Sequence, residues 1–250
     1  MSAVGRGQWQ LSLNPSLQVS DFAIIRNPPF WTGVFAIVRV PRGNYKRNLG
    51  HSFWVHVYTS NNFFYQVGFE EAGRGPPEAN ETFWRAFWAT TRVLVNPDDT
   101  NSVDSQQQFD DGKELIAEKG KEYLLYIELG DGTIDMGIWD GDTGRMLVSK
   151  KFTEASPVLR GGNAAPQCSF TLEAIEQYED ADYGDIEDFI VRSLAIQHDE
   201  ATGIDYPVTK VRVEVFINYP PAFLGVKRID DYRLLIGQGY PLPRGLSAEI

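Results

Sequence analysis

Apolar and polar residues alternate with a period of two along most of the chain, which is typical of β-strands. In NNFFYQVGFEEAG (61–73), aromatic and aliphatic residues occupy one face of the predicted strand. The other face carries Phe64, Gln66 and Glu70 beside Gly68. Similar runs of alternating, β-branched and aromatic residues predict strands at 30–40, 52–59, 63–70, 82–95, 122–129, 133–140, 145–152, 168–176 and 210–219.

Short segments rich in Gly and Asp separate these runs and predict hairpin turns at 59–62, 129–133 and 140–144. We therefore expect an all-β fold, a two-sheet antiparallel sandwich or jelly roll, over residues 1–250 as a single domain. Residues 220–250 are rich in Pro and Gly and are expected to wrap the sandwich as a C-terminal tail.

Two segments interrupt the strand pattern. Residues 96–114 are polar and predict a long surface loop. Residues 177–203 begin as an acidic run, which is usually a solvated surface, and continue with apolar residues at helical spacing from Ile186 to Leu194. This spacing predicts one short helix.

Composition and charge exclude several classes of partner. The chain has 250 residues and a formal net charge of −11, from 23 basic and 34 acidic residues. This charge argues against nucleic-acid binding through a basic surface and against attachment to an anionic membrane. No apolar run reaches the length of a membrane span, and the segment MSAVGRGQWQ at the start lacks the apolar core of a signal peptide, so the sequence leaves the localisation open.

The single cysteine, Cys168, cannot form an internal disulfide and is expected to be a small buried hydrophobe. No metal site is expected: His51 and His56 are five residues apart, so they fall on opposite faces of one strand. The Asp-rich segment 140–144 fits a turn better than a calcium loop.

Aromatic residues also occupy the strand faces opposite the predicted core. These aromatic residues are Trp54 and Tyr58 in the strand 52–59 and Trp84 and Trp88 in the strand 82–95, and Arg92 shares the face of the two tryptophans. Large rings are costly to expose to water, so this second face is either covered by another part of the chain or binds a ligand. A groove of this composition suits sugar rings, which stack on aromatic side chains, or an extended peptide.

The order of these motifs resembles the glutamic peptidases (eqolisins), which are concanavalin-like jelly rolls. The matching segments are YQVGF around Gln66, FWRAFW at 83–88, the hairpins of 123–152 and LEAIE around Glu173. The sequence departs from the family at Arg85 and Ala86, where the family usually has an acidic residue, and at Ala174, where it tends to have Trp. The resemblance implies an extracellular acid endopeptidase that needs no metal or other cofactor.

In that reading Glu173 is the general base that activates water, and Gln66 donates its amide N–H to the oxyanion. The substrate-binding residues would be Trp54, Tyr58, Phe64, Glu70, Trp84, Trp88 and Arg92. Two alternatives remain: a lectin-like module that holds a polysaccharide in the aromatic groove, and an assembly protein whose aromatic face is buried by a neighbouring subunit. The oligomeric state is not indicated by the sequence.

Overall fold

The structure, a computed structural model of the 250-residue chain, describes a series of separate segments. These segments are residues 8–15, 33–40, 49–59, 61, 63–74, 81–92, 115–154, 168–176, 189–199, 204–207, 211–217, 224–230, 233–238 and 247–249. They form β-strands joined by turns, and all strand pairs are antiparallel. The predicted all-β architecture of two antiparallel sheets is confirmed.

The first sheet has eight strands. Its order is β16 (Ser247–Glu249), β13 (Val211–Ile217), β1 (Gln8–Pro15), β10 (Cys168–Glu176), β3 (Leu49–Tyr58), β4 (Phe63–Arg74), β5 (Glu81–Arg92) and β6 (Ile116–Ala117).

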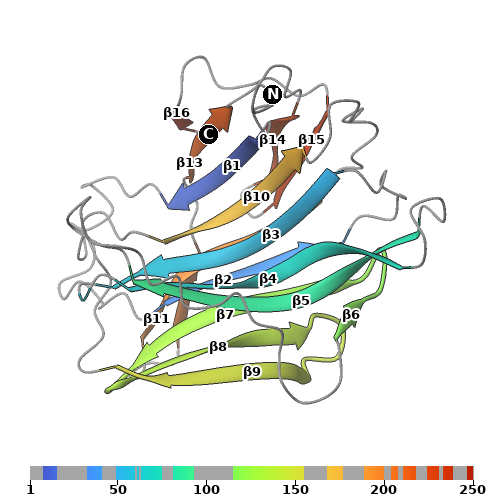
Figure 1. Cartoon of the computed structure of the whole chain (residues 1–250). Coiled ribbons are helices and arrows are strands. Elements are labelled where there is room, and N and C mark those ends of the chain that lie inside the picture. Colours follow the sequence, from blue (N-terminus) through green and yellow to red (C-terminus); the bar gives the residue numbers. More distant parts are fainter. Residues whose placement is uncertain are drawn as a thin grey trace, which may run out of the picture.

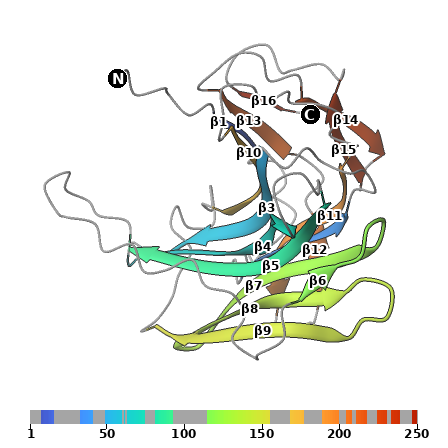
Figure 2. The ribbon, with the colours of Figure 1, turned by 45° about the vertical axis from the view of Figure 1, so that its right-hand side comes forward.

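The second sheet follows the order β14 (Leu224–Asp230), β15 (Arg233–Gln238), β11 (Phe189–Asp199), β2 (Gly33–Arg39), β7 (Glu122–Gly130), β8 (Thr133–Asp140) and β9 (Met146–Thr153), and β12 (Ile204–Pro207) pairs with β11. Figure 1 shows β13, β14, β15 and β16 together at the top of the molecule and β7, β8 and β9 at the bottom. The same arrangement is visible after a turn of 45° (Figure 2).

All nine segments predicted as strands contain strands in the structure. The predicted turns at 129–133 and 140–144 are also confirmed, with Gly132 at φ 70° and Gly144 at φ 67°. At the second turn the side chain of Asp140 accepts the backbone N–H groups of Asp142 and Thr143 at 3.0 and 2.9 Å. This segment is therefore a turn, as expected, and the Asp140 carboxylate stabilises it by accepting hydrogen bonds from the backbone.

The helix predicted near Ile186–Leu194 is wrong, because residues 189–199 form strand β11. The register with β2 shifts between Arg192 and Leu194. As a result Val191 and Leu194, three residues apart, pair with Val38 and Ala36, which both lie in the core. A bulge interrupts the strict period-two alternation of a strand, so this segment lacks the simple strand pattern.

The predictions for the C-terminal tail, the polar loop and the acidic run can be compared with the structure only where it describes these residues. The described parts of 220–250 are strands: β14 and β15 form a hairpin in the second sheet, and β16 pairs with β13 in the first. The predicted loop at 96–114 and the acidic residues 177–188 lie outside the described residues.

The core fills the space between the inner faces of the two sheets. Strands β3 and β4 of the first sheet pack on β7 of the second. Phe53 lies at the centre, with ring centroids 5.0 Å from Trp84 and 5.5 Å from Phe69. Phe69 in turn contacts Tyr123 of the second sheet at 5.2 Å. Burial of these large rings contributes favourably to folding.

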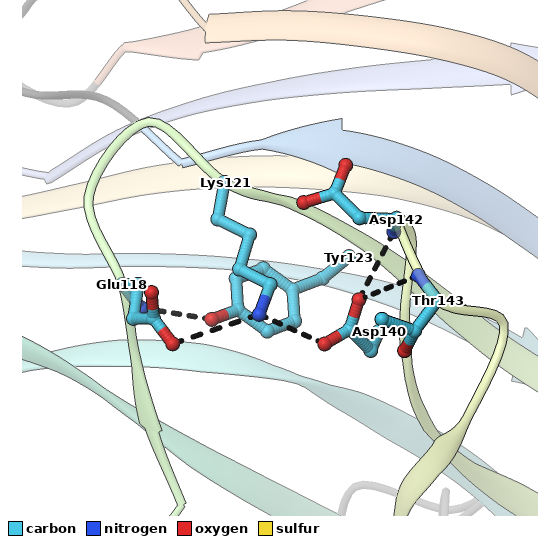
Figure 3. A network of polar contacts seen from close by, with 6 residues as sticks. All are labelled: Glu118, Lys121, Tyr123, Asp140, Asp142 and Thr143. Carbon is cyan, nitrogen blue, oxygen red and sulfur yellow. Dashed lines mark hydrogen bonds and ion pairs between the residues drawn. The ribbon is translucent and has the colours of Figure 1, made fainter.

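A polar network joins two turns at one end of strands β7 and β8 of the second sheet (Figure 3). The Lys121 ammonium contacts Asp140 Oδ2 at 2.8 Å and Glu118 Oε1 at 3.5 Å. The backbone N–H of Glu118 donates to the Tyr123 hydroxyl at 2.8 Å. The pKa of Asp140 is lowered to about 2, first by the hydrogen bond from Lys121 and then by that from Thr143. The Asp140 carboxylate thus contacts both turns and links them.

Candidate functional site

The face of the first sheet that points away from the core is called the outer face here. Cross-strand pairing places Ser169 of β10, His56 of β3, Gln66 of β4 and Ala89 of β5 in one row across it. The neighbouring row towards one end contains Tyr58 and Phe64 of the paired strands β3 and β4. Rows towards the other end contain Thr171, Trp54, Gly68 and Phe87, and then Glu173, Ser52, Glu70 and Arg85.

Trp84 and Trp88 lie on the opposite, inner face, so their predicted place beside Gln66 is wrong. Trp88 pairs with Val67, and both tryptophans are core residues with exposed fractions of 1% and 4%. Arg92, which shares their parity in β5, pairs with Phe63, and its side chain lies outside the described residues. The predicted alternation along β5 is correct, but the face assigned to the core is the outer one. Alternation within one strand does not determine which of its two faces points to the core.

Arg85 belongs to the outer face, where it forms an ion pair with Glu70. The two residues are cross-strand partners, and Arg85 Nη2 and Nε donate to Glu70 Oε1 at 2.6 and 3.1 Å. The carboxylate of Glu70, which was predicted to bind substrate, is therefore paired with the guanidinium group of Arg85. Both charged side chains lie on the face of β4 and β5 that points away from the core.

Gln66 and Glu173 lie on the same face but are not neighbours. Glu173 pairs with Ser52, which pairs with Glu70, whereas Gln66 shares its row with His56 and Ser169. The two residues are separated by two strand spacings, about 10 Å, and by four residues along the strands, about 13 Å. Their Cα atoms are thus about 16 Å apart along the sheet. The side chain of Glu173 lies outside the described residues.

Three aromatic side chains form a compact group beside Gln66, called the ring cluster here: His56, Tyr58 and Phe64. Ring centroids are 5.5 Å apart for His56 and Tyr58, 5.0 Å for His56 and Phe64, and 4.8 Å for Tyr58 and Phe64. All three side chains and that of Gln66 are half-buried. The cluster thus presents ring surface and polar atoms together at one end of the outer face.

His56 was not among the predicted site residues. Its imidazole nitrogens lie 3.1 and 3.2 Å from the hydroxyl oxygen of Ser169, which is itself 3.2 Å from that of Thr171. Ser169 and Thr171 are fully buried. Desolvation lowers the pKa of His56 to about 3, so the imidazole is neutral at pH 7. A neutral imidazole has one nitrogen that donates a hydrogen bond and one that accepts.

The depressed pKa of His56 predicts a loss of stability in mild acid. The unfolded chain takes up a proton near pH 6.5, but the folded protein does so only near pH 3, so stability falls as the pH drops through this window. Between pH 7.5 and pH 5 we expect a loss of about 1–2 kcal/mol, discounted because the ring is half-buried. Urea unfolding of the protein and of His56→Gln at both pH values measures this difference. Equal losses in the two proteins would contradict the assignment.

The centre of the outer face is closed. Trp54 and Phe87 meet edge-to-face at 6.4 Å across Gly68, and their exposed fractions are 7% and 2%. Gly68 lacks the side chain that would stand between rings borne two strands apart. The indole N–H of Trp54 is buried and has no hydrogen-bond partner within the described part of the chain. Trp54 was predicted as a ligand contact and is instead largely covered, whereas the members of the ring cluster are half-buried.

Other classes of site find no support among the described residues. That part of the chain contains no group of three or more His, Cys, Asp or Glu side chains placed to hold a metal. Cys168 is buried, as expected, and this burial raises the pKa of its thiol. No helix within the described segments has the length and apolar character needed to span a membrane.

Comparisons with known proteins leave the family open. No protein-family model matches the chain, and no curated protein matches it. One similar solved structure is a β-porphyranase from the human gut bacterium Bacteroides plebeius, with 8% identity, a TM-score of 0.26, and coverage of 62% of this chain and 55% of that one. Another is the CBM2 module of an evolved Dit of Lactobacillus casei BL23 phage J-1, with 10% identity, a TM-score of 0.23, and coverage of 70% and 55%. The chain thus spans about half the length of each, and TM-scores this low do not establish a shared fold.

Proposed function

We propose that this protein binds a polysaccharide through the ring cluster on the outer face of the first sheet. The observation that carries the proposal is the half-buried group of His56, Tyr58 and Phe64 beside the amide of Gln66. The C–H faces of sugar rings pack on aromatic rings, and sugar hydroxyls both donate and accept hydrogen bonds. Gln66 and the neutral imidazole of His56 can also each donate and accept.

The acid-endopeptidase hypothesis receives less support from the geometry. It requires the base and the oxyanion donor to act on one carbonyl group, within about 3 Å of the reacting atoms. The register instead separates the Cα atoms of Gln66 and Glu173 by about 16 Å. The residues that adjoin Gln66 in its row are His56 and Ala89, neither of which is a carboxylate.

Removal of the ring cluster tests the proposal. We expect Tyr58→Ala combined with Phe64→Ala to weaken binding at least about tenfold, since each stacked ring contributes on the order of 1 kcal/mol. Affinity electrophoresis in gels that contain soluble polysaccharides measures this loss. Because both rings are half-buried, the variant should remain folded, which circular dichroism and thermal unfolding check.

A matched control lies on the second sheet. Tyr126 and Trp139 are half-buried aromatic residues on β7 and β8, with centroids 6.3 Å apart. Their joint replacement by alanine removes a comparable pair of rings and should leave binding unchanged. Loss of binding in this control alone would place the site on the other sheet and overturn the proposal. Casein cleavage between pH 2 and 7 that Glu173→Gln abolishes would restore the peptidase hypothesis.

A further inference from the structure

The charges on the outer face bear on the chemical class of its ligand. Among the outer-face side chains that the structure describes, Arg85 is the one permanent cation, and Glu70 pairs with it. The Arg85–Glu70 pair also lies in the row of Ser52, four residues along β3 from His56. Four residues of a strand span about 13 Å, so this cation is remote from the ring cluster.

The polar groups of the ring cluster and of the adjacent Gln66 are uncharged. Gln66 carries an amide, and Ser169, fully buried, holds the imidazole of His56 by a contact of 3.1–3.2 Å. Burial keeps the pKa of this imidazole near 3, so it supplies no positive charge at neutral pH. The cluster can therefore match hydroxyl groups but offers no counter-charge to a carboxylate or a sulfate.

The net negative charge of the protein also disfavours an anionic ligand. With 34 acidic against 23 basic residues, the protein repels polyanions, and a ligand with an anionic group on each repeat would need local cations to overcome this repulsion. Proteins that bind polyanions supply such cations as clusters of Arg and Lys.

We propose that the ligand of the ring cluster is a neutral polysaccharide, whose repeating sugars carry hydroxyl groups but no uronate or sulfate. This inference rests on the proposed function and adds the class of glycan. Uncharged sugar rings then lie against Tyr58 and Phe64, while Gln66 and His56 exchange hydrogen bonds with their hydroxyls.

A panel of soluble glycans separates this inference from the proposed function. The neutral probes are laminarin, hydroxyethyl cellulose and galactomannan, and the acidic probes are alginate, polygalacturonate and carrageenan. We expect retardation by at least one neutral probe, at least tenfold weaker binding to every acidic probe, and loss of the neutral binding in the Tyr58→Ala, Phe64→Ala variant. Binding to acidic probes alone, again lost in the variant, would overturn the neutral class but keep the proposed function. No binding to any probe would overturn both.

Salt and pH provide an independent readout. Binding of a neutral glycan should change less than about twofold between 50 and 500 mM NaCl, because no ion pair is screened. It should also stay constant between pH 8 and pH 5, where His56 remains neutral. Affinity that falls steeply with salt, or rises as the pH drops through 6, would show that cationic groups hold the ligand and would overturn the inference.

Discussion

Replacement of Gly68 by valine should lower the free energy of unfolding by about 3–4 kcal/mol or prevent folding. A Cβ atom at this position would lie 2.0 Å from the Phe53 carbonyl oxygen and 2.6 Å from both Cα and Cβ of Trp54. The clashing atoms are backbone and first side-chain atoms of β3, so no rotamer change relieves them. Strands β3 and β4 would have to separate in the middle of the first sheet, and the contact of Trp54 with Phe87 would be disturbed.

Gly144 supplies the control for this substitution. It has φ 67°, and a Cβ atom there would meet nothing within 4 Å. Asn is tolerated in this left-handed region, so Gly144→Asn should change stability by less than about 1 kcal/mol. Urea unfolding at pH 7 compares the two variants. A Gly68→Val protein as stable as Gly144→Asn would show that the two strands do not approach as closely as described.

The period-two pattern located the strands because alternation is a local property, but it could not assign their faces. In β5 both faces are rich in rings: Trp84 and Trp88 on one, Phe83 and Phe87 on the other. Only pairing with β4 shows that Trp88 meets Val67 in the core. Arg85 carried a usable signal, since a charged residue in the Phe87 set argues that this set faces away from the core.

The catalytic pair inferred from family resemblance is not brought together by the register, for a related reason. Motif order along the chain determines which strands carry Gln66 and Glu173, but it does not determine cross-strand register. A four-residue offset keeps two residues on one face and still separates them by about 13 Å along the sheet. His56 was not among the predicted site residues, although its parity with Trp54 and Tyr58 predicts that it shares their face of the strand.

A second large effect is expected at Glu154, which joins the two sheets. This residue follows β9 and is 7% exposed. Its carboxylate accepts hydrogen bonds from Thr59 Oγ1 at 2.9 Å, Asn61 Nδ2 at 2.9 Å and the Tyr65 hydroxyl at 2.6 Å. Thr59 is fully buried and Tyr65 is 4% exposed, so neither hydroxyl can turn to water if the carboxylate is removed.

Glu154→Leu should therefore lower the free energy of unfolding by about 3–4 kcal/mol, since each buried donor left unpaired costs about 1–3 kcal/mol. Glu154→Gln keeps one acceptor oxygen and should lose about half as much. The exposed Glu118 is the matched control, and Glu118→Gln should change stability by less than about 0.5 kcal/mol. Urea unfolding at pH 7 measures all three. A Glu154→Leu protein as stable as the Glu118→Gln control would contradict the role assigned to the carboxylate.

The hydrogen bonds of Glu154 also connect the stability of the fold with the proposed binding face. Thr59 and Asn61 belong to the turn that follows Tyr58 and precedes β4, so Glu154 fixes the segment that joins two members of the ring cluster. Tyr65→Phe removes the 2.6 Å hydrogen bond but not the ring. If this bond carries the coupling, Tyr65→Phe and Glu154→Gln should interact by about 1–2 kcal/mol in a double-mutant cycle of unfolding free energies. Additive losses would mean that the hydrogen bond between Tyr65 and Glu154 does not carry the coupling.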